Sequence, residues 1–189
     1  MSRALFIVDV QNDFTEGGAL GVDGGDAVAE RITRYLAEHA GDYAVIAASR
    51  DWHDADNDNG GHFSANPDYV DSWPVHCVAG TEGAEYDPGL DTTAITHHLY
   101  KGRGKPDYSL FQGATEEGTT AIDLVRTNGI TEVDVVGIAT DHCVRASALD
   151  ALRAGLRVRV LTNLVAGVAP ESSAAALKQL AAEGAELLD

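Results

Sequence analysis

One of the two cysteines, Cys143, lies where a short apolar run gives way to a helical pattern. Residues 133–137 predict a strand, and residues 141–154 predict a helix. A thiol in the first turn of a helix meets free N–H groups that favour the thiolate, and a pKa lowered by about two units would make it mostly ionised at neutral pH. Cys143 is therefore a candidate nucleophile. The alternative is a structural cysteine that behaves as a small apolar residue.

Two charged residues, Asp9 and Lys101, lie at the ends of other apolar runs, at residues 4–10 and 96–100. An acid that accepts and returns a proton, together with a cation that holds a thiolate, completes an acyl-transfer set with a cysteine. The alternatives are a turn-capping role for Asp9 and a solvated position for Lys101.

A second group of side chains has the composition of a metal site. It contains Asp51, His53, His62 and His76, in a polar stretch of the chain. Three imidazoles and one carboxylate suit a divalent ion such as zinc, iron or manganese. Cys77 could serve as a softer ligand, although a structural role is preferred for it. The alternative is a set of unrelated surface histidines. Solvated or local hydrogen-bonding roles are expected for the other histidines, His39, His97, His98 and His142.

The elements that must position these residues follow a regular alternation of strand and helix. We expect strands at residues 4–10, 43–48, 96–100, 133–137, 157–161 and 186–188, and helices at 26–39, 119–128, 141–154 and 171–183. Short, almost continuously apolar strands indicate a parallel sheet covered on both faces. The predicted fold is a three-layer α/β/α domain with a mainly parallel, roughly six-stranded sheet. In such sheets the ligand lies beyond the carboxyl ends of the strands, where the charged residues stand.

One stretch, residues 49–90, contains no convincing helix and is rich in Asp, Gly, Asn, Pro and His. An irregular segment of about 40 residues inside a compact domain is usually functional, and we expect it to be the metal-binding loop region. Loop aromatics are the expected walls of a small pocket, with ordinary loop packing as the alternative: Phe14, Trp52, Trp73 and Tyr108.

The composition limits the partners of the chain. Its 189 residues predict a single domain, and 30 acidic against 13 basic residues give a formal net charge of -17. This charge argues against nucleic acid and anionic membrane surfaces as partners. Two cysteines are too few for a disulfide framework, and no signal peptide or membrane span is recognised, so a cytoplasmic location is expected. No Gly-x-Ser-x-Gly elbow, P-loop or Gly-x-Gly-x-x-Gly turn is found.

Six segments, in this order and spacing, resemble the isochorismatase-like cysteine hydrolases: FIVDVQNDF, SRDWH, GHFS, WPVHC, LYKG and VVGIATDHCV. Within that superfamily the Asp-x-His…His…His set is similar to that of the nicotinamidase/pyrazinamidase family. The resemblance runs from about residue 4 to 170. It implies the isochorismatase-like hydrolase fold, one divalent metal ion, and hydrolysis of nicotinamide, and of pyrazinamide, to the acid and ammonia through a cysteine thioester in NAD salvage.

The resemblance also implies a role for each matching residue. Cys143 would be the nucleophile, Asp9 the proton shuttle and Lys101 the cation that stabilises the thiolate. Asp51, His53, His62 and His76 would hold the metal. The Ile138–Ala139 peptide bond would be cis, and the N–H groups of Ala139 and Cys143 would form an oxyanion hole. The substrate-binding residues would be Phe14, Trp73, Tyr108 and Ile138.

Other functions stay open at this point. The chain could be an amidohydrolase of the same superfamily for another small amide or an N-carbamoyl compound. It could be a metallohydrolase in which bound hydroxide attacks and Cys143 is incidental. It could also be a non-catalytic metal-binding module. The expected partner is a small-molecule amide, with homo-oligomer formation left open.

Overall fold

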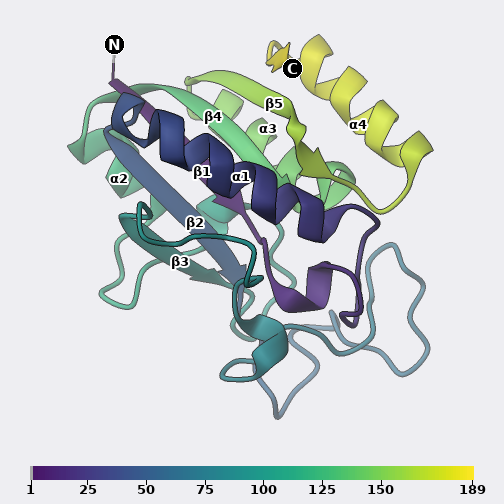
Figure 1. Cartoon of the computed structure of the whole chain (residues 1–189). Coiled ribbons are helices and arrows are strands. Elements are labelled where there is room, and N and C mark those ends of the chain that lie inside the picture. The colour runs from purple at the N-terminus through teal and green to yellow at the C-terminus, as the bar shows by residue number, and fades with distance from the viewer. Residues whose placement is uncertain (1) are drawn as a thin grey trace.

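The apolar runs form one six-stranded sheet in the computed structural model of the chain, which describes residues 2–189. All neighbouring strands are parallel, in the order β3-β2-β1-β4-β5-β6. The chain moves outward from β1 to β3, then returns to the other side of β1, so the order reverses between β1 and β4 (Figure 1). The strands are β1 (Ser2–Val8), β2 (Val45–Asp51), β3 (His97–Lys101), β4 (Ile130–Ile138), β5 (Arg157–Ala166) and β6 (Glu186–Leu188).

Helices cover both faces of the sheet, which confirms the predicted three-layer α/β class. One face packs against α1 (Gly25–His39), and the other against α2 (Ala121–Thr127), α3 (Arg145–Arg153) and α4 (Pro170–Ala182). In β1, Leu5 and Ile7 join the α1 side while Phe6 and Val8 join the opposite side. This alternation of side chains across a doubly covered sheet explains why the strand is apolar at every position from Ala4 to Val8.

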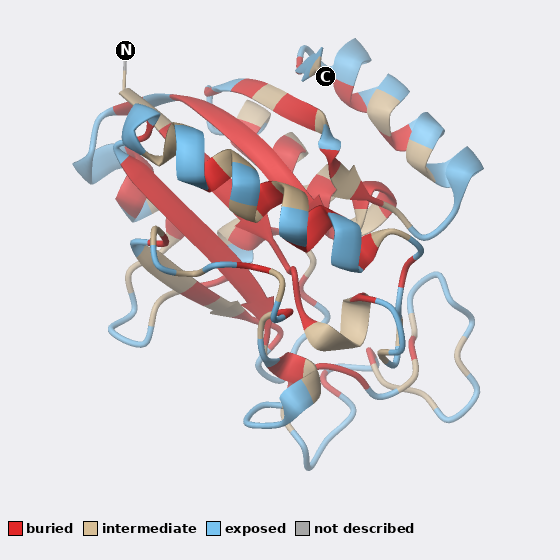
Figure 2. Ribbon diagram, in the orientation of Figure 1, coloured by how far each residue is buried: buried red, intermediate tan, exposed pale blue. Residues whose placement is uncertain are grey.

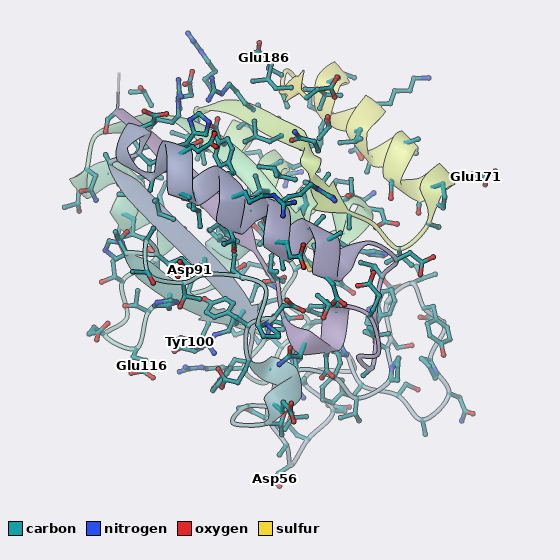
Figure 3. All side chains as sticks on the ribbon, viewed as in Figure 1. Asp56, Asp91, Tyr100, Glu116, Glu171 and Glu186 are labelled. Atoms are coloured by element: carbon teal, nitrogen blue, oxygen red, sulfur yellow. The ribbon has the colours of Figure 1, made fainter. Side chains whose placement is uncertain are left out.

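The degree of burial differs between the sheet and the helices that cover it. The central strands are buried along their length, whereas each helix is buried only along the stripe that meets the sheet (Figure 2). Acidic side chains such as Asp56, Glu116, Glu171 and Glu186 are exposed and project from the body of the molecule (Figure 3). The negative charge therefore lies largely at the surface. Within residues 2–189, no helix combines the length and apolarity needed to span a membrane.

The helix expected at residues 141–154 differs at its start. Its first turn, Thr140–Val144, is a π-helical turn, and α3 begins only at Arg145. The carbonyl of Ala139 accepts hydrogen bonds from the N–H groups of both His142 and Val144, at 3.0 Å each. The bond to Val144 is the i→i+5 pattern that widens the turn.

Strand ends also differ from the expectations. β1 ends at Val8 because Asp9 takes a left-handed backbone conformation with φ of 49°. β5 continues to Ala166, five residues past the expected end, because Val165 and Ala166 pair with the end of β4. The Ile138–Ala139 peptide bond is cis, as expected.

Candidate active site

The carboxyl ends of four strands bring the chemically active side chains together. Asp9 directly follows β1, while Asp51 and Lys101 are the last residues of β2 and β3 and are paired in register. Cys143 lies in the π-helical turn after β4. The site thus lies at the edge where the strand order reverses, the usual ligand position in open parallel sheets.

Lys101 is at the centre of this group. Its side chain is 1% exposed, and Nζ donates a hydrogen bond to Asp51 Oδ1 and lies 2.8 Å from Asp9 Oδ2. The same nitrogen lies 3.8 Å from Cys143 Sγ. Burial alone would lower the pKa of Lys101, but the carboxylates of Asp51 and Asp9 raise it well above its usual value. Lys101 is therefore a fixed positive charge beside the thiol.

The Cys143 thiol is protonated in this arrangement. Burial raises its pKa well above the ordinary value; Lys101 opposes that effect, while Asp9 and Asp51 add to it. The lowered pKa expected from the start of the helix is therefore wrong for this state. Two nearby carboxylates and a dry environment outweigh one ammonium ion and the turn. Thiolate formation must then be coupled to transfer of the proton to a nearby acceptor.

Asp9 is placed to be that acceptor. It is fully buried, its Oδ1 accepts a hydrogen bond from Ser49 Oγ at 2.6 Å, and its Oδ2 faces Lys101. Burial raises the pKa of Asp9, Lys101 acts in the opposite direction, and Asp51 adds to the rise. A carboxyl whose proton affinity is increased in this way is a better match for a thiol proton than a solvated aspartate.

The three predicted histidines form a cluster beside this group. Ligand atoms of His53, His62 and His76 all lie within 4.8 Å of one another. Asp51 Oδ2 is 3.5 Å from His53 Nε2 and 3.7 Å from His76 Nε2. Burial raises the pKa of Asp51, but Lys101 and these two histidines more than offset it and hold the pKa well below the usual range.

The donor set fits a divalent metal ion. His53 Nδ1 and His76 Nδ1 each lie 2.8 Å from a backbone carbonyl oxygen, those of Gly102 and Pro74. Donation from Nδ1 leaves the lone pair on Nε2, and His53 Nε2 is buried with no hydrogen-bond partner among residues 2–189. Burial is the main cause that lowers the pKa of His62 to about 3, so this imidazole is neutral. Neutral imidazoles with unused lone pairs are what such an ion requires.

Cys77 takes no part in this cluster. Its side chain is buried, its Sγ lies 3.8 Å from the carbonyl oxygen of Gly83, and its N–H donates to Asp13 Oδ2 at 2.7 Å. The preferred structural role agrees with this position. The softer-ligand alternative does not, because the histidine ligand atoms gather without it.

A cavity of about 430 Å³ opens onto both groups. Cys143, Asp51, His62 and His76 line it together with aromatic side chains. Three of the predicted substrate-binding residues form these aromatic walls: Phe14, Trp73 and Tyr108. Trp73 Nε1 donates a hydrogen bond to Tyr108 Oη at 2.9 Å, which holds two of the walls in place.

Two predicted wall residues lie elsewhere. Ile138 is fully buried in the core on the α1 face and does not line the cavity, because alternation along β4 turns its side chain into the sheet packing. Trp52 packs edge-on against Tyr100, with ring centroids 5.1 Å apart, outside the cavity. Ala139, the predicted oxyanion-hole partner of Cys143, does line the cavity.

His142 is a wall residue that the sequence interpretation missed. Its ring lies 5.1 Å from that of Trp73 and is stacked on Tyr108 at 6.5 Å, measured between centroids. Burial lowers its pKa, so the ring is neutral at neutral pH. Its position next to Cys143, just after a strand end, is the signal that could have found it.

A larger cleft, of about 580 Å³, lies between the loop after β1 and the Glu82–Ala84 turn. It is lined by acidic and small residues and holds neither cysteine nor histidine. The chemistry of the molecule is therefore in the smaller cavity.

The fold and the site together define a parallel α/β protein with a buried Cys–Lys–Asp group beside a histidine metal cluster. The chain belongs to the isochorismatase family: the Isochorismatase domain model matches residues 3–189. This membership confirms the predicted superfamily.

Individual relatives agree with that assignment. Over 186 residues the chain is 53% identical to a nicotinamidase/pyrazinamidase from Mycobacterium tuberculosis (strain ATCC 25618 / H37Rv), with 98% of each protein covered. Its fold is similar to a pyrazinamidase of Pyrococcus horikoshii in complex with zinc, with a TM-score of 0.81, 36% identity, and coverage of 100% and 99%. It is also similar to PnC1 from L. infantum in complex with nicotinate, with a TM-score of 0.85, 31% identity, and coverage of 100% and 92%.

Proposed function

We propose that this protein is a nicotinamidase that hydrolyses nicotinamide to nicotinate and ammonia, and pyrazinamide to its acid in the same way. The observation that carries the proposal is that Cys143 and two histidines of the cluster, His62 and His76, line one cavity, with Lys101 Nζ 3.8 Å from Cys143 Sγ. Relatives named as nicotinamidases, and a structural neighbour that holds nicotinate, support this substrate.

The reaction begins with a proton transfer. Asp9 takes the proton of the Cys143 thiol, and Lys101 stabilises the thiolate that forms. The sulfur attacks the amide carbon, and a tetrahedral intermediate with a negatively charged oxygen results. Asp9 then returns the proton to the departing nitrogen, and ammonia leaves. Asp9 next removes a proton from water, and the hydroxide attacks the thioester carbon. The C–S bond then breaks, the acid leaves, and Asp9 returns its proton to the Cys143 sulfur.

Backbone N–H groups stabilise the oxygen anion. Ala139 and Cys143 both line the cavity, and their N–H groups are the proposed oxyanion hole. One such donor lowers the barrier by roughly 3 kcal/mol in other hydrolases. The turn that carries Cys143 therefore supplies the nucleophile and a donor to the anion.

Asp51, His53, His62 and His76 would hold the metal ion, which would be zinc, iron or manganese; the zinc-containing neighbour supports this class of ion. A divalent ion held there would supply a Lewis acid for a ring-nitrogen donor of the substrate. The aromatic walls of the cavity, Phe14, Trp73 and Tyr108, would contact the flat ring of the substrate.

Ammonia release from nicotinamide tests the proposal. The wild type should release ammonia, Cys143→Ala should not, and Cys77→Ala should retain activity because Cys77 lies outside the cavity. Absence of release by the wild type, with another small amide accepted instead, would overturn the substrate assignment. Full activity of Cys143→Ala would overturn covalent catalysis and favour attack by metal-bound hydroxide.

A further inference from the structure

Ser49 is a fully buried hydroxyl one strand away from the proposed proton acceptor. It lies on β2, and its register partner on β1 is Val8, the residue before Asp9. The backbone N–H of Asp9 donates to the carbonyl oxygen of Ser49 at 3.2 Å, and Ser49 Oγ donates to Asp9 Oδ1 at 2.6 Å. Two hydrogen bonds therefore join these residues, and one of them fixes the carboxylate itself.

The two oxygens of Asp9 have different surroundings. Oδ1 is occupied by the Ser49 hydroxyl, whereas Oδ2 lies 2.8 Å from Lys101 Nζ and makes no hydrogen bond to residues 2–189. The Lys101 ammonium ion is already shared with Asp51. Oδ2 is thus the oxygen that is free to receive a proton, and it lies beside the ammonium ion that adjoins the Cys143 sulfur.

We infer that Ser49 is a positioning residue for the reaction: its hydroxyl holds Oδ1 of Asp9 and so keeps Oδ2 beside Lys101 Nζ, the atom that also adjoins the Cys143 thiol. This inference rests on the proposed function for its catalytic meaning. The rotation of a carboxylate about its last bond is broad, so a group that must accept a proton in one direction needs a second contact. Without the hydroxyl, Oδ1 is a buried acceptor with no partner, and the carboxylate loses the contact that fixes its rotation.

The effect of Ser49 on the ionisation of Asp9 also supports a positioning role. Burial raises the pKa of Asp9, and the bond from Ser49 is one of the interactions that opposes this rise. Ser49 therefore supports the ionised form, which is the form able to accept the thiol proton.

Three substitutions separate this role from simple packing. Ser49→Ala removes the hydroxyl. The threonine and valine side chains of Ser49→Thr and Ser49→Val have the same shape as each other, but only threonine carries a hydroxyl. The Thr and Val pair decides the question if Ser49→Ala does not fold. Thr96→Val is the matched control, because the Thr96 hydroxyl also bonds to β2, at the Ile46 carbonyl oxygen (2.8 Å), but near the opposite end of the strand.

Two measurements are made on the metal-loaded protein. The first is the rate at which iodoacetamide alkylates Cys143 without substrate, located by peptide mass spectrometry to distinguish it from Cys77. The second is kcat and KM for nicotinamide, with bound metal and thermal stability determined for each variant. We expect Ser49→Ala and Ser49→Val to slow alkylation and lower kcat about tenfold or more, with KM and metal content unchanged. Ser49→Thr and Thr96→Val should stay close to wild type.

Equal rates for Ser49→Thr and Ser49→Val would overturn the inference. So would a loss of kcat that follows a loss of metal, because the effect would then act through Asp51. If the wild type releases no ammonia but alkylation still depends on the hydroxyl, the proposed function fails and the positioning role of Ser49 stands.

Discussion

Asp51 and Lys101 are register partners at the ends of β2 and β3, and their side chains meet in a hydrogen bond from Nζ to Oδ1. The same ammonium ion lies against Asp9 and Cys143, so it connects the proposed nucleophile with the histidine cluster. A single buried cation thus balances two buried carboxylates, and the pairing of two neighbouring strands determines its position.

Replacement of this cation should be costly. Lys101→Met leaves Asp9 and Asp51 buried without their counter-ion, and the free energy of unfolding should fall by about 3–5 kcal/mol. Urea denaturation followed by fluorescence measures the change. Lys178→Met, an exposed position on α4, is the control and should change stability by less than about 0.5 kcal/mol. Similar stabilities for both variants would show that the buried network contributes little.

Gly102 should be essential for the position of His53. Its φ is +80°, and a Cβ atom there would lie 2.5 Å from His53 Cε1. Gly102→Ala should therefore displace the imidazole and weaken metal binding roughly 10–100-fold, the size of other losses around metal ligands. Gly155→Ala is the matched control, with φ of +82° and nothing within 4 Å of the added carbon. Both variants carry the same backbone strain, but only Gly102→Ala contacts His53. The amount of metal that stays bound after dialysis therefore distinguishes the contact with His53 from backbone strain. Full retention of metal by Gly102→Ala would contradict this account.

Much of the fold could be predicted because it depends on patterns within single segments. Apolar runs and glycine-ended helices locate every strand and helix, and the rule for parallel sheets brings Asp9, Asp51, Lys101 and Cys143 to one edge. The predicted ends of strands are less accurate where pairing with a neighbouring strand determines them, as at Ala166, the last residue of β5.

The remaining features depend on three-dimensional surroundings. The pKa of Cys143 depends on burial and on the charges of Lys101, Asp9 and Asp51, which come from three other strand ends, so the local turn alone predicts the wrong direction. Whether an aromatic ring faces the cavity depends on loop packing: Trp73 lines the cavity, whereas Trp52 packs against Tyr100 outside it.

The loop region expected at residues 49–90 is held in place largely by contacts within the protein. Residues 49–51 belong to β2, and side chains order much of the rest. Gln11 bonds to both the N–H and the carbonyl of Asp51, and the Asn59 carboxamide accepts from the N–H groups of Asp54 and Gly104. The metal site is therefore inferred from the histidine cluster, not from the irregular backbone of this segment.

Metal content should depend on His53 and His76. Alanine at either position removes a ligand, and purified protein should contain much less zinc, iron or manganese than the wild type. His39→Ala is the control, since His39 lies at the end of α1, outside the cluster, with its Nδ1 3.1 Å from Asp42 Oδ2. A chelator should lower the melting temperature of the wild type and of His39→Ala, because an ion at 100 times its Kd stabilises by about 2.7 kcal/mol. It should have little effect on His76→Ala; an equal effect would show that the ion is bound elsewhere.

Asp141 should make stability depend on pH. Its carboxylate is 4% exposed and accepts hydrogen bonds from Val168 N at 3.0 Å and from the Ser172 hydroxyl, so it joins the turn of Cys143 to the start of α4. Burial would raise its pKa, but these bonds outweigh burial and lower it. A lowered pKa in the folded state stabilises the protein above the pKa of the unfolded chain, about 3.9, and this stabilisation disappears as the pH falls through the folded value.

The test compares the wild type with Asp141→Asn from pH 3 to 7. Hydrogen bonds to a charged group contribute about 1.5–3 kcal/mol each in favourable cases, so Asp141→Asn should lower the free energy of unfolding by about 1–2 kcal/mol at pH 7. The difference should shrink steadily below about pH 4, because the wild-type carboxyl becomes neutral like the amide. Asp150→Asn on α3 is the control: its carboxylate pairs at the surface with Arg153, 72% exposed, and should contribute less than about 1 kcal/mol. A difference between Asp141→Asn and wild type that stays constant across this pH range would show that shape, rather than charge, holds the turn against α4.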